Sequence, residues 1–337
     1  MQFHRLFSGL LYAGMIMPAV SSCIYEYDTC QPERDINIVN DWELVAKASP
    51  KGMAFIFFSE DGSAPWRFDF PGMEGGMVNM PQGRYSMLSF NDDTYNVRFI
   101  ENEGYGGYTA YTEKADNVAF EGSEVAPPVR LPEKQTDVGE NFVECPDMMW
   151  GCSYCAVTIG NTTLTYEESG GGGPYSVPVT SASFLLEAHQ RQLTARYRFT
   201  IDDVENLDGV KAMSATFSGL AGAENLADGR KTAYPSTLPS KVDIYGDSTI
   251  GGDFVTFGIP CEPTAENTLS LMVLLHDGRK FNYRFDVTDQ VRAAENPLDV
   301  HVRIAGLSLE PSTPGGDSGA FEVGVDGWIS ITINIDS

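Results

Sequence analysis

Apolar and polar residues alternate along most of this chain, and no other feature restricts its fold so strongly. The clearest run is 193–201, LTARYRFTI, in which every second residue is apolar. Two further runs, 269–275 and 281–287, flank Asp277-Gly278, a pair favoured by type I′ hairpin turns. A period of two places the apolar side chains on one face of a strand. The sequence therefore predicts an all-β fold of antiparallel strands without a long amphipathic helix.

The chain has 337 residues, which at ~150 residues per domain predicts about two domains. A stretch with little periodicity, containing Pro127, Pro128 and Pro132, separates two strand-rich halves. We therefore predict two tandem antiparallel β-sandwiches. The predicted parts are a signal peptide (1–22), an acidic tether (23–35), an N-terminal sandwich (36–125), a linker (126–142), a C-terminal sandwich (143–305) and a Gly/Pro linker with C-terminal strands (306–337).

The first 23 residues have the features of a bacterial export signal. Arg5 precedes the charge-free apolar stretch 6–20, which is shorter than the ~20 residues that span a bilayer. Val20-Ser21-Ser22-Cys23 then matches the lipobox, in which the cysteine is lipidated and becomes the first mature residue. Acyl chains such as palmitate on Cys23 would hold the protein in a membrane. The acidic residues that follow resemble the signal that displays some bacterial lipoproteins on the exterior face of the outer membrane. A plain secretory signal with a coincidental cysteine is the alternative.

The chain is strongly acidic, because 22 Lys and Arg against 47 Asp and Glu give a formal net charge of −25. This balance argues against a nucleic-acid partner, which needs a basic face to neutralise its phosphates. Only four His are present, which leaves little material for metal-centred or imidazole-driven catalysis. Because the strand-rich body also offers no convincing catalytic motif, we predict neither an enzyme nor a cofactor. Gly316-Asp317-Ser318-Gly319 copies the loop around the nucleophile of chymotrypsin-like proteases, but it lies in a Gly/Pro linker and its surroundings do not resemble those enzymes.

Five cysteines remain once Cys23 is assigned to lipid, so one of them has no partner. Cys145, Cys152 and Cys155 could be interpreted as three zinc ligands that lack a fourth. In an exported chain, a disulfide or buried thiols are the favoured interpretation, and we predict no metal site. The sequence does not choose the pairing. The candidate disulfide partners are Cys145, Cys152, Cys155 and Cys261.

Two other patterns allow a functional and a structural interpretation. Tyr105, Tyr108 and Tyr111 could form a surface on which a glycan stacks, but at strand spacing we expect packed sheet aromatics. Asp92-Asp93 and Asp202-Asp203 could bind Ca²⁺ through their oxygens, but adjacent aspartates are commonplace in turns.

The C-terminal tail ends in a strand with an isoleucine at every second position. Burying an isoleucine side chain contributes roughly 1.5–3 kcal/mol, so docking of this strand is favoured over a free tail. The strand either completes its own domain or adds to the sheet edge of another subunit. The candidate residues for such strand exchange are Trp328, Ile329, Ile331, Ile333 and Ile335.

A set of short motifs at turns and strand starts runs through the chain. They are the lipobox, the Pro-x-Gly-x-Tyr corner at 81–85, PDMMW at 146–150, SGLA at 218–221, the pair at 277–278 leading into FDVTDQV at 285–291, and VDGW at 325–328. Together they resemble the fimbrillin-associated surface lipoproteins of Bacteroidota, which are related to minor-fimbrium anchor proteins. The resemblance implies two transthyretin-like β-sandwiches, outer-membrane attachment, fimbrial subunits as partners, and assembly by strand addition.

We therefore interpret the chain as an outer-membrane lipoprotein that serves as a fimbrial anchor or accessory subunit with a role in cell adhesion. The alternative is a surface lipoprotein that binds host or microbial glycans in a polysaccharide-uptake system. Exposed aromatic platforms would favour the alternative.

Overall fold

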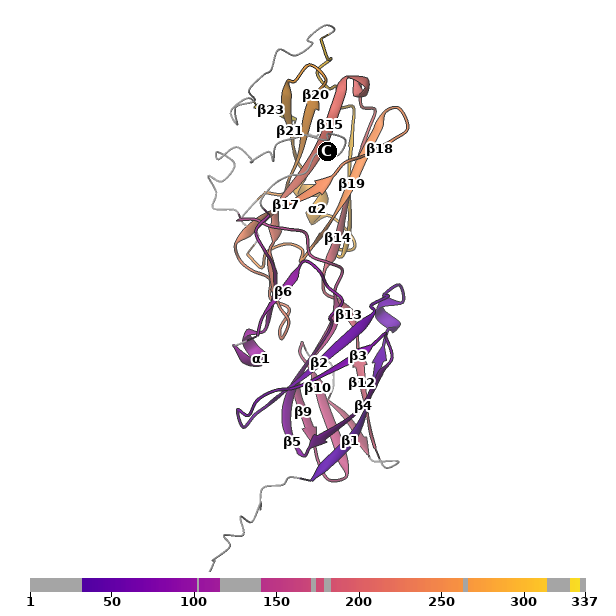
Figure 1. Ribbon diagram of the computed structural model, residues 1–337, viewed down its shortest axis with the longest axis vertical. Helices are drawn as coiled ribbons and strands as arrows, with labels where there is room; N and C mark the ends of the chain where they lie inside the picture. The colour runs from indigo at the N-terminus through magenta and orange to yellow at the C-terminus, as the bar shows by residue number, and fades with distance from the viewer. Residues whose placement is uncertain are drawn as a thin grey trace, which may run out of the picture.

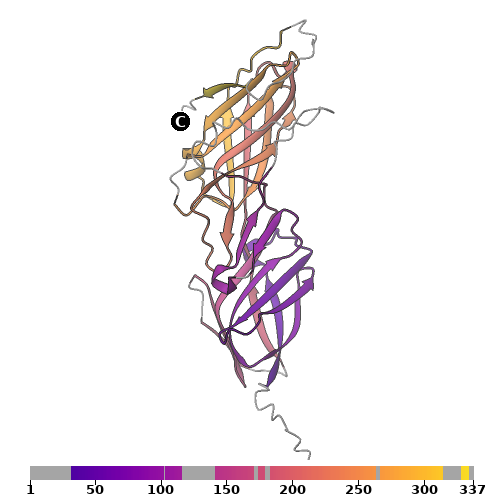
Figure 2. The same ribbon diagram turned by 60° about the vertical axis from the view of Figure 1, so that its left-hand side comes forward.

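The protein is an elongated stack of two β-sandwiches, one above the other along the long axis (Figures 1 and 2). The computed structural model describes residues 32–101, 103–115, 141–170, 174–178, 183–262, 266–313 and 328–333. Nearly all regular structure is β-strand, which confirms the predicted all-β class. No helix among these residues is both long and apolar enough to cross a membrane.

The first sandwich, the lower one in Figure 1, packs a three-stranded sheet against a larger one. The small sheet has the order β12-β1-β4, and the large sheet has the order β11-β10-β9-β5-β2-β3, with β13 paired to β9. The strands are β1 (Glu33–Asp41), β2 (Gly52–Ser59), β3 (Trp66–Pro71), β4 (Gly75–Pro81), β5 (Gly83–Asn91), β9 (Trp150–Ile159), β10 (Thr163–Glu168), β11 (Tyr175–Pro178), β12 (Phe184–His189) and β13 (Arg191–Gln192).

The alternation of β1 explains how the small sheet closes this sandwich. Ile36 and Ile38 point inward and are fully buried, against Phe55 and Phe57 of β2 among others. β1 runs antiparallel to β4 and parallel to β12, with Ile36 opposite Phe184. The first strand of the described residues is therefore the middle strand of its sheet and completes the core of the first sandwich.

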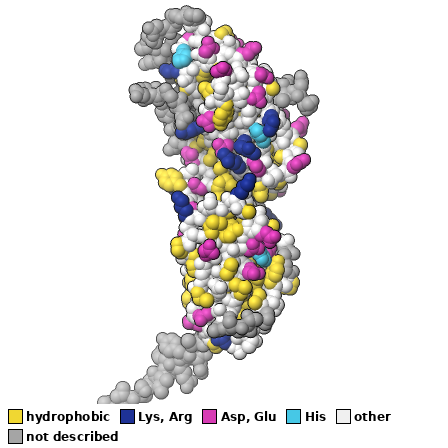
Figure 3. Space-filling model, turned by 90° about the vertical axis from the view of Figure 1, so that its right-hand side faces the viewer, with side chains coloured by type: hydrophobic (Ala, Val, Ile, Leu, Met, Phe, Trp, Pro, Cys, Tyr) yellow, Lys and Arg dark blue, Asp and Glu magenta, His cyan; other side chains and the backbone are white. Residues whose placement is uncertain are grey.

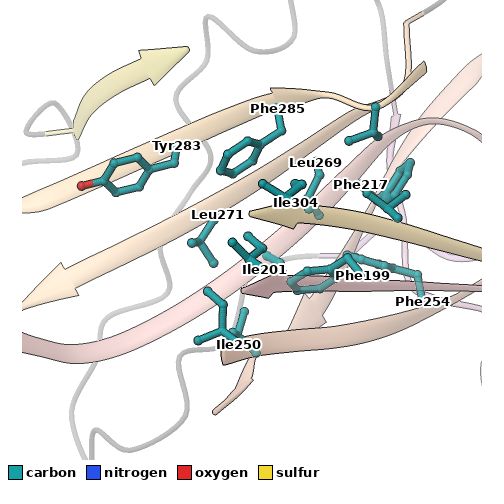
Figure 4. Close-up of a cluster of buried hydrophobic side chains, with 14 of the residues drawn as sticks. Phe199, Ile201, Phe217, Ile250, Phe254, Leu269, Leu271, Tyr283, Phe285 and Ile304 are labelled. Carbon is teal, nitrogen blue, oxygen red and sulfur yellow. The ribbon is translucent and has the colours of Figure 1, made fainter. Parts of the chain in front are cut away.

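The second sandwich packs the sheet β18-β19-β14-β22 against the sheet β23-β21-β20-β15-β17-β8. Aromatic and aliphatic side chains from both sheets interdigitate in its core, as Figure 4 shows for Phe217, Phe199 and Phe254. The strands are β8 (Asn141–Phe142), β14 (Ala195–Asp202), β15 (Val210–Ala221), β17 (Pro235–Lys241), β18 (Asp243–Tyr245), β19 (Thr249–Thr256), β20 (Thr268–Leu275), β21 (Lys280–Asp286), β22 (Asp299–Ala305) and β23 (Trp328–Ile333); the helix α2 (Thr288–Arg292) follows β21.

The predicted hairpin is the antiparallel pair β20–β21, with Leu271 opposite Tyr283. Its turn differs from the predicted type I′, because only Gly278 has a positive φ, of 86°, while Asp277 does not. The Gly278 amide donates to the Leu275 carbonyl, and the Leu275 amide donates to the Arg279 carbonyl. The connection therefore has four residues with Gly278 in the left-handed region, a longer loop than the two-residue turn.

A third, three-stranded sheet lies at the junction of the two sandwiches. It contains β6 (Val97–Ile100) and β7 (Thr109–Thr112) from the N-terminal half of the chain and β16 (Ala223–Asn225), which lies between β15 and β17 in sequence. This junction sheet covers the outer face of the large sheet of the first sandwich, where Phe90 and Ile56 contact its apolar side chains. The helix α1 (Gly104–Gly107) connects β6 to β7. The two sandwiches thus share a hydrophobic cluster.

The structure divides the chain differently from the predicted boundary at 126–142. β9 is antiparallel to β5, with Tyr85 opposite Val157, and β12 pairs with β1. The strands from Trp150 to Gln192 therefore complete the first sandwich, although the sequence placed them in the 143–305 domain. The reason is physical: strand pairing between distant segments leaves no local signal, whereas a Pro-rich loop leaves a strong one.

Candidate functional site

The C-terminal strand β23 lies on the edge of the second sandwich. It runs parallel to β21, with Ile331 opposite Tyr283 and Ile333 opposite Phe285. Ile331 and Ile333 are half-buried against the core, whereas Ile329 is 51% exposed. Within the described residues, β21 is the one strand with which β23 pairs. The strand thus docks on its own domain and keeps its outer edge unpaired by any described strand; Ile335 and the side chain of Trp328 lie outside the described residues.

The hairpin turn before β21 holds the segment that leads toward this strand. Asp277 accepts hydrogen bonds from the Thr313 amide at 2.9 Å and the Thr313 hydroxyl at 2.8 Å. The Arg279 guanidinium bonds to Asp277 and donates to the Pro311 carbonyl. The bonds from Arg279 and Thr313 hold the pKa of the Asp277 carboxyl well below its usual range. The chain is therefore fixed to the sandwich as far as residue 313.

Another edge of the second sandwich is closed by a side chain. Gln290 of α2 donates from Nε2 to the Arg303 carbonyl at 3.0 Å and accepts from the Arg303 amide at 2.8 Å. Its amide group occupies the place of a neighbouring strand's peptide along β22. Natural sheets block exposed edges in ways such as this, because an open edge can pair with another chain. The edge strand β22 is therefore blocked, whereas the outer edge of β23 is not paired by any described strand.

The four candidate disulfide partners within the described residues are all free thiols. Cys152 is buried on the core side of β9, and Cys155, three residues along the same strand, is exposed. Burial raises the pKa of the Cys152 thiol to about 12, and likewise that of Cys145. Cys261 is exposed in the loop after β19. The predicted disulfide is therefore not formed among these residues, since the strand geometry of β9 points its two thiols to different environments.

The tyrosines and paired aspartates have structural roles. Tyr108 is 2% exposed, and Tyr105 is half-buried in the junction cluster, where its hydroxyl contacts Ser169 at 2.6 Å. Tyr105 and Tyr108 thus match the packed interpretation, and Tyr111 on β7 is half-buried. Asp93 accepts from the Lys51 amide, and Asp202 accepts from the Thr249 hydroxyl, so both aspartates link the ends of paired strands that are distant in sequence. No group of three or more His, Cys, Asp or Glu among the described residues is placed to hold a metal.

One imidazole contacts two carboxylates. Nδ1 of His189 on β12 bonds to Glu168 at the end of β10, and its Nε2 lies 3.9 Å from Asp41 at the end of β1. The ring also packs edge-on against Tyr175. These contacts join the two sheets of the first sandwich, which is a structural role. Cys23, the predicted lipidation site, lies outside the described residues.

The sequence analysis missed a buried ion pair at the junction. Glu224 of β16 is 5% exposed, and its carboxylate accepts a hydrogen bond from the Lys231 ammonium at 2.7 Å. Burial raises the pKa of the Glu224 carboxyl, and the neighbouring Lys231 opposes this. No pattern around position 224 signals the burial, because it depends on strands from the other half of the chain.

The surface carries the acidic charge of the chain on both sandwiches. Figure 3 shows acidic side chains over both halves and a group of Lys and Arg side chains near the middle of the molecule. On the outward face of β14, Arg196 pairs with Asp253 and Arg198 pairs with Asp299, each at 2.8 Å. Exposed pairs of this kind add little stability, about 0–1 kcal/mol each.

Comparisons with known proteins agree with this architecture. Over 93 residues the chain is 30% identical to "Putative fimbrium anchoring subunit Fim4B" of Bacteroides ovatus, and the match spans 28% of each protein. A crystal structure of "a putative adhesin" from Bacteroides ovatus has a TM-score of 0.60 at 20% identity and covers 84% of this chain and 95% of that one. That similarity shows a shared fold.

The structure of the fimbrial anchor protein Mfa2 from Porphyromonas gingivalis has a TM-score of 0.48 at 14% identity, covering 82% of this chain and 91% of that one. A family described as "Domain of unknown function (DUF5119)" matches residues 22–240, which is more than half of the chain. The similarity to the Fim4B relative agrees with the resemblance to fimbrillin-like proteins of Bacteroidota. The chain belongs to the DUF5119 family.

Proposed function

We propose that the protein is an outer-membrane lipoprotein that acts as a fimbrial anchor or accessory subunit in cell adhesion. The observation that supports the proposal is that the first and last described strands lie near opposite ends of the molecule. β1, which follows the predicted lipid attachment site, belongs to the lower sandwich, and β23 lies near the opposite end of the molecule (Figure 1). Attachment through Cys23 would therefore place β23 far from the membrane, where a neighbouring subunit can reach it.

The relative named as a fimbrium anchoring subunit supports this role. The chain matches 28% of the length of that protein, so its function is carried over as part of the proposal. The centre of the small sheet gives independent support. Because Ile36 and Ile38 of β1 fill the first core, that sandwich is complete without a strand from another subunit. We therefore assign the contact with a neighbouring subunit to the distal sandwich and its strand β23.

Replacing Cys23 with Ala tests the membrane attachment. We expect the C23A protein to leave the outer-membrane fraction, because no described helix can span a bilayer and the acyl chains would supply the attachment. Cell fractionation followed by immunoblotting measures the distribution, with C30A as a matched control that keeps the lipobox. Retention of C23A in the outer membrane at the level of C30A would refute the lipid anchor.

Replacing Ile329 with Asp tests the shared strand. Ile329 is largely exposed in the docked strand, so the charge should leave the monomer folded while preventing β23 from entering an apolar groove of a neighbour. We expect at least a tenfold loss of fimbrial subunits that co-purify with the protein. Ile244, 55% exposed on β18, gives the control I244D. Equal recovery of subunits with both variants would contradict strand sharing.

A further inference from the structure

A cavity of about 240 Å³ lies at the junction, where the large sheet of the first sandwich meets β16 and its following loop. Its walls come from segments far apart in sequence: β5, β9, the end of β10, β13 and the loop from β16 to β17. The cavity lining includes three charged and two apolar side chains: Arg191, Glu224, Asp228, Leu193 and Leu226. Neither sandwich alone provides the complete set of walls.

Two charged side chains in the cavity, Arg191 and Glu224, have hydrogen-bonding atoms without a partner among the described residues. Arg191 is exposed, and its guanidinium forms no ion pair or hydrogen bond with a described residue. Glu224 binds Lys231 through Oε2, while no described residue donates to its Oε1. Oε1 faces Gly229, which also lines the cavity: a Cβ on that glycine would lie 3.9 Å from this oxygen. The cavity therefore offers free donors and a free acceptor.

These two groups lie close enough to influence each other. Burial raises the pKa of the Glu224 carboxyl, and the positive charge of Arg191 is among the neighbours that lower it. Cys152 also lines the cavity, and its thiol responds in the same way: burial raises its pKa, and the positive charge of Arg191 lowers it. Arg191 thus acts electrostatically on both walls of the cavity, from the side of β13.

The charge balance selects the class of ligand. The Glu224 and Asp228 carboxylates line the cavity, whereas Lys231 and Arg230, which pair with them, are not among its lining residues. A carboxylate ligand would therefore gain Arg191 but lie beside two carboxylates, and a cationic ligand would gain those carboxylates but lie beside Arg191. A guanidinium only donates hydrogen bonds and a carboxylate only accepts them, whereas a hydroxyl does both. A neutral polyol can therefore accept from Arg191 and donate to Glu224 at the same time. Leu193 and Leu226 provide apolar surface for the C–H groups of such a molecule.

We propose that this junction cavity binds one neutral hexopyranose residue, with its hydroxyls between Arg191 and Glu224. The volume is below the ~300–1,000 Å³ of sites for drug-sized ligands, so it suits a single ring. Because the walls come from both halves of the chain, the bound sugar would contact both sandwiches. This site is separate from β23 and independent of the anchor role.

The test uses the folded protein and the methyl glycosides of glucose, galactose, mannose and N-acetylglucosamine. These probes have ~13 to 16 heavy atoms, and each is titrated to 50 mM. Two-dimensional amide NMR spectra should show saturable shifts at Gly151 and Gly229, with a Kd of order 1–10 mM for at least one probe. Absence of saturable shifts with all four would overturn the proposal.

Two variants and one further ligand sharpen the test. R191M removes the unpaired guanidinium, so we expect its Kd to rise at least about tenfold, the loss expected for a hydrogen bond to a charged group. R84M is the matched control, since Arg84 is 72% exposed and does not line the cavity. Equal affinity of R191M and R84M would refute the role of Arg191. Binding of methyl glucuronoside ten times tighter than methyl glucoside would show an anion site and would equally overturn the proposal.

Discussion

Replacing Phe217 with Ala should lower the free energy of unfolding by about 3–5 kcal/mol, the range for large-to-small changes in a well-packed core. Phe217 is fully buried, and its ring meets Tyr197 at 5.8 Å and Phe254 at 5.4 Å between centroids. Its neighbours come from both sheets of the second sandwich (Figure 4). The surrounding strands cannot collapse into the space without breaking their ladders, so the cavity would persist.

Urea denaturation of F217A and the parent protein measures this effect. The matched control is I244A, because Ile244 lies on β18 of the same sandwich but is 55% exposed. We expect I244A to change the free energy of unfolding by less than about 0.5 kcal/mol. A difference of under 1 kcal/mol between F217A and I244A would show that the core is not packed around this ring.

Replacing Lys231 with Met should lower the free energy of unfolding at pH 7 by about 3 kcal/mol, because it leaves the buried Glu224 carboxylate without its partner. Glu224 is 6% exposed at its side chain and Lys231 is 25% exposed. R230M is the control at the next position, since Arg230 is 82% exposed and its pair with Asp228 is worth little. Thermal denaturation measures the stability of K231M and R230M. If the two variants are equally stable, the buried Glu224–Lys231 pair does not contribute as expected.

The effect of K231M should depend on pH in a defined direction. Burial already raises the pKa of Glu224, and removing Lys231 removes a positive charge that lowers it. A carboxyl with a raised folded pKa favours the folded state when protonated, so its penalty is absent below the unfolded pKa of ~4.3 and grows as the pH rises. The deficit of K231M relative to the parent should therefore be largest at pH 7 and shrink toward pH 4. A deficit that stays constant over this range would exclude Glu224 as its source.

Local pattern predicted the individual strands well. The alternation of 193–201 gives β14, with Tyr197 and Phe199 inside and Arg196 and Arg198 outside. The same reasoning placed Ile331 and Ile333 against a core. These predictions succeed because a strand with one buried face must alternate, whatever it pairs with.

The partners of those strands could not be predicted in the same way. Nothing near Trp150 indicates that β9 pairs with β5, and nothing near Ile36 indicates a parallel partner at Phe184. The junction cavity has the same origin, since Arg191 and Glu224 belong to sheets that meet only in three dimensions. Polar residues such as these look like ordinary surface residues until the surrounding strands are known.

The position of β1 has a consequence for the order in which the protein acquires its structure. Ile36 is paired with Phe184, roughly 150 residues later in the chain, so the small sheet cannot be completed until β12 has been synthesised. Contacts of such long sequence separation slow folding and leave apolar strands uncovered for longer. The yield of native protein should therefore depend on how long the first 180 residues wait for β12 without associating through their exposed apolar strands.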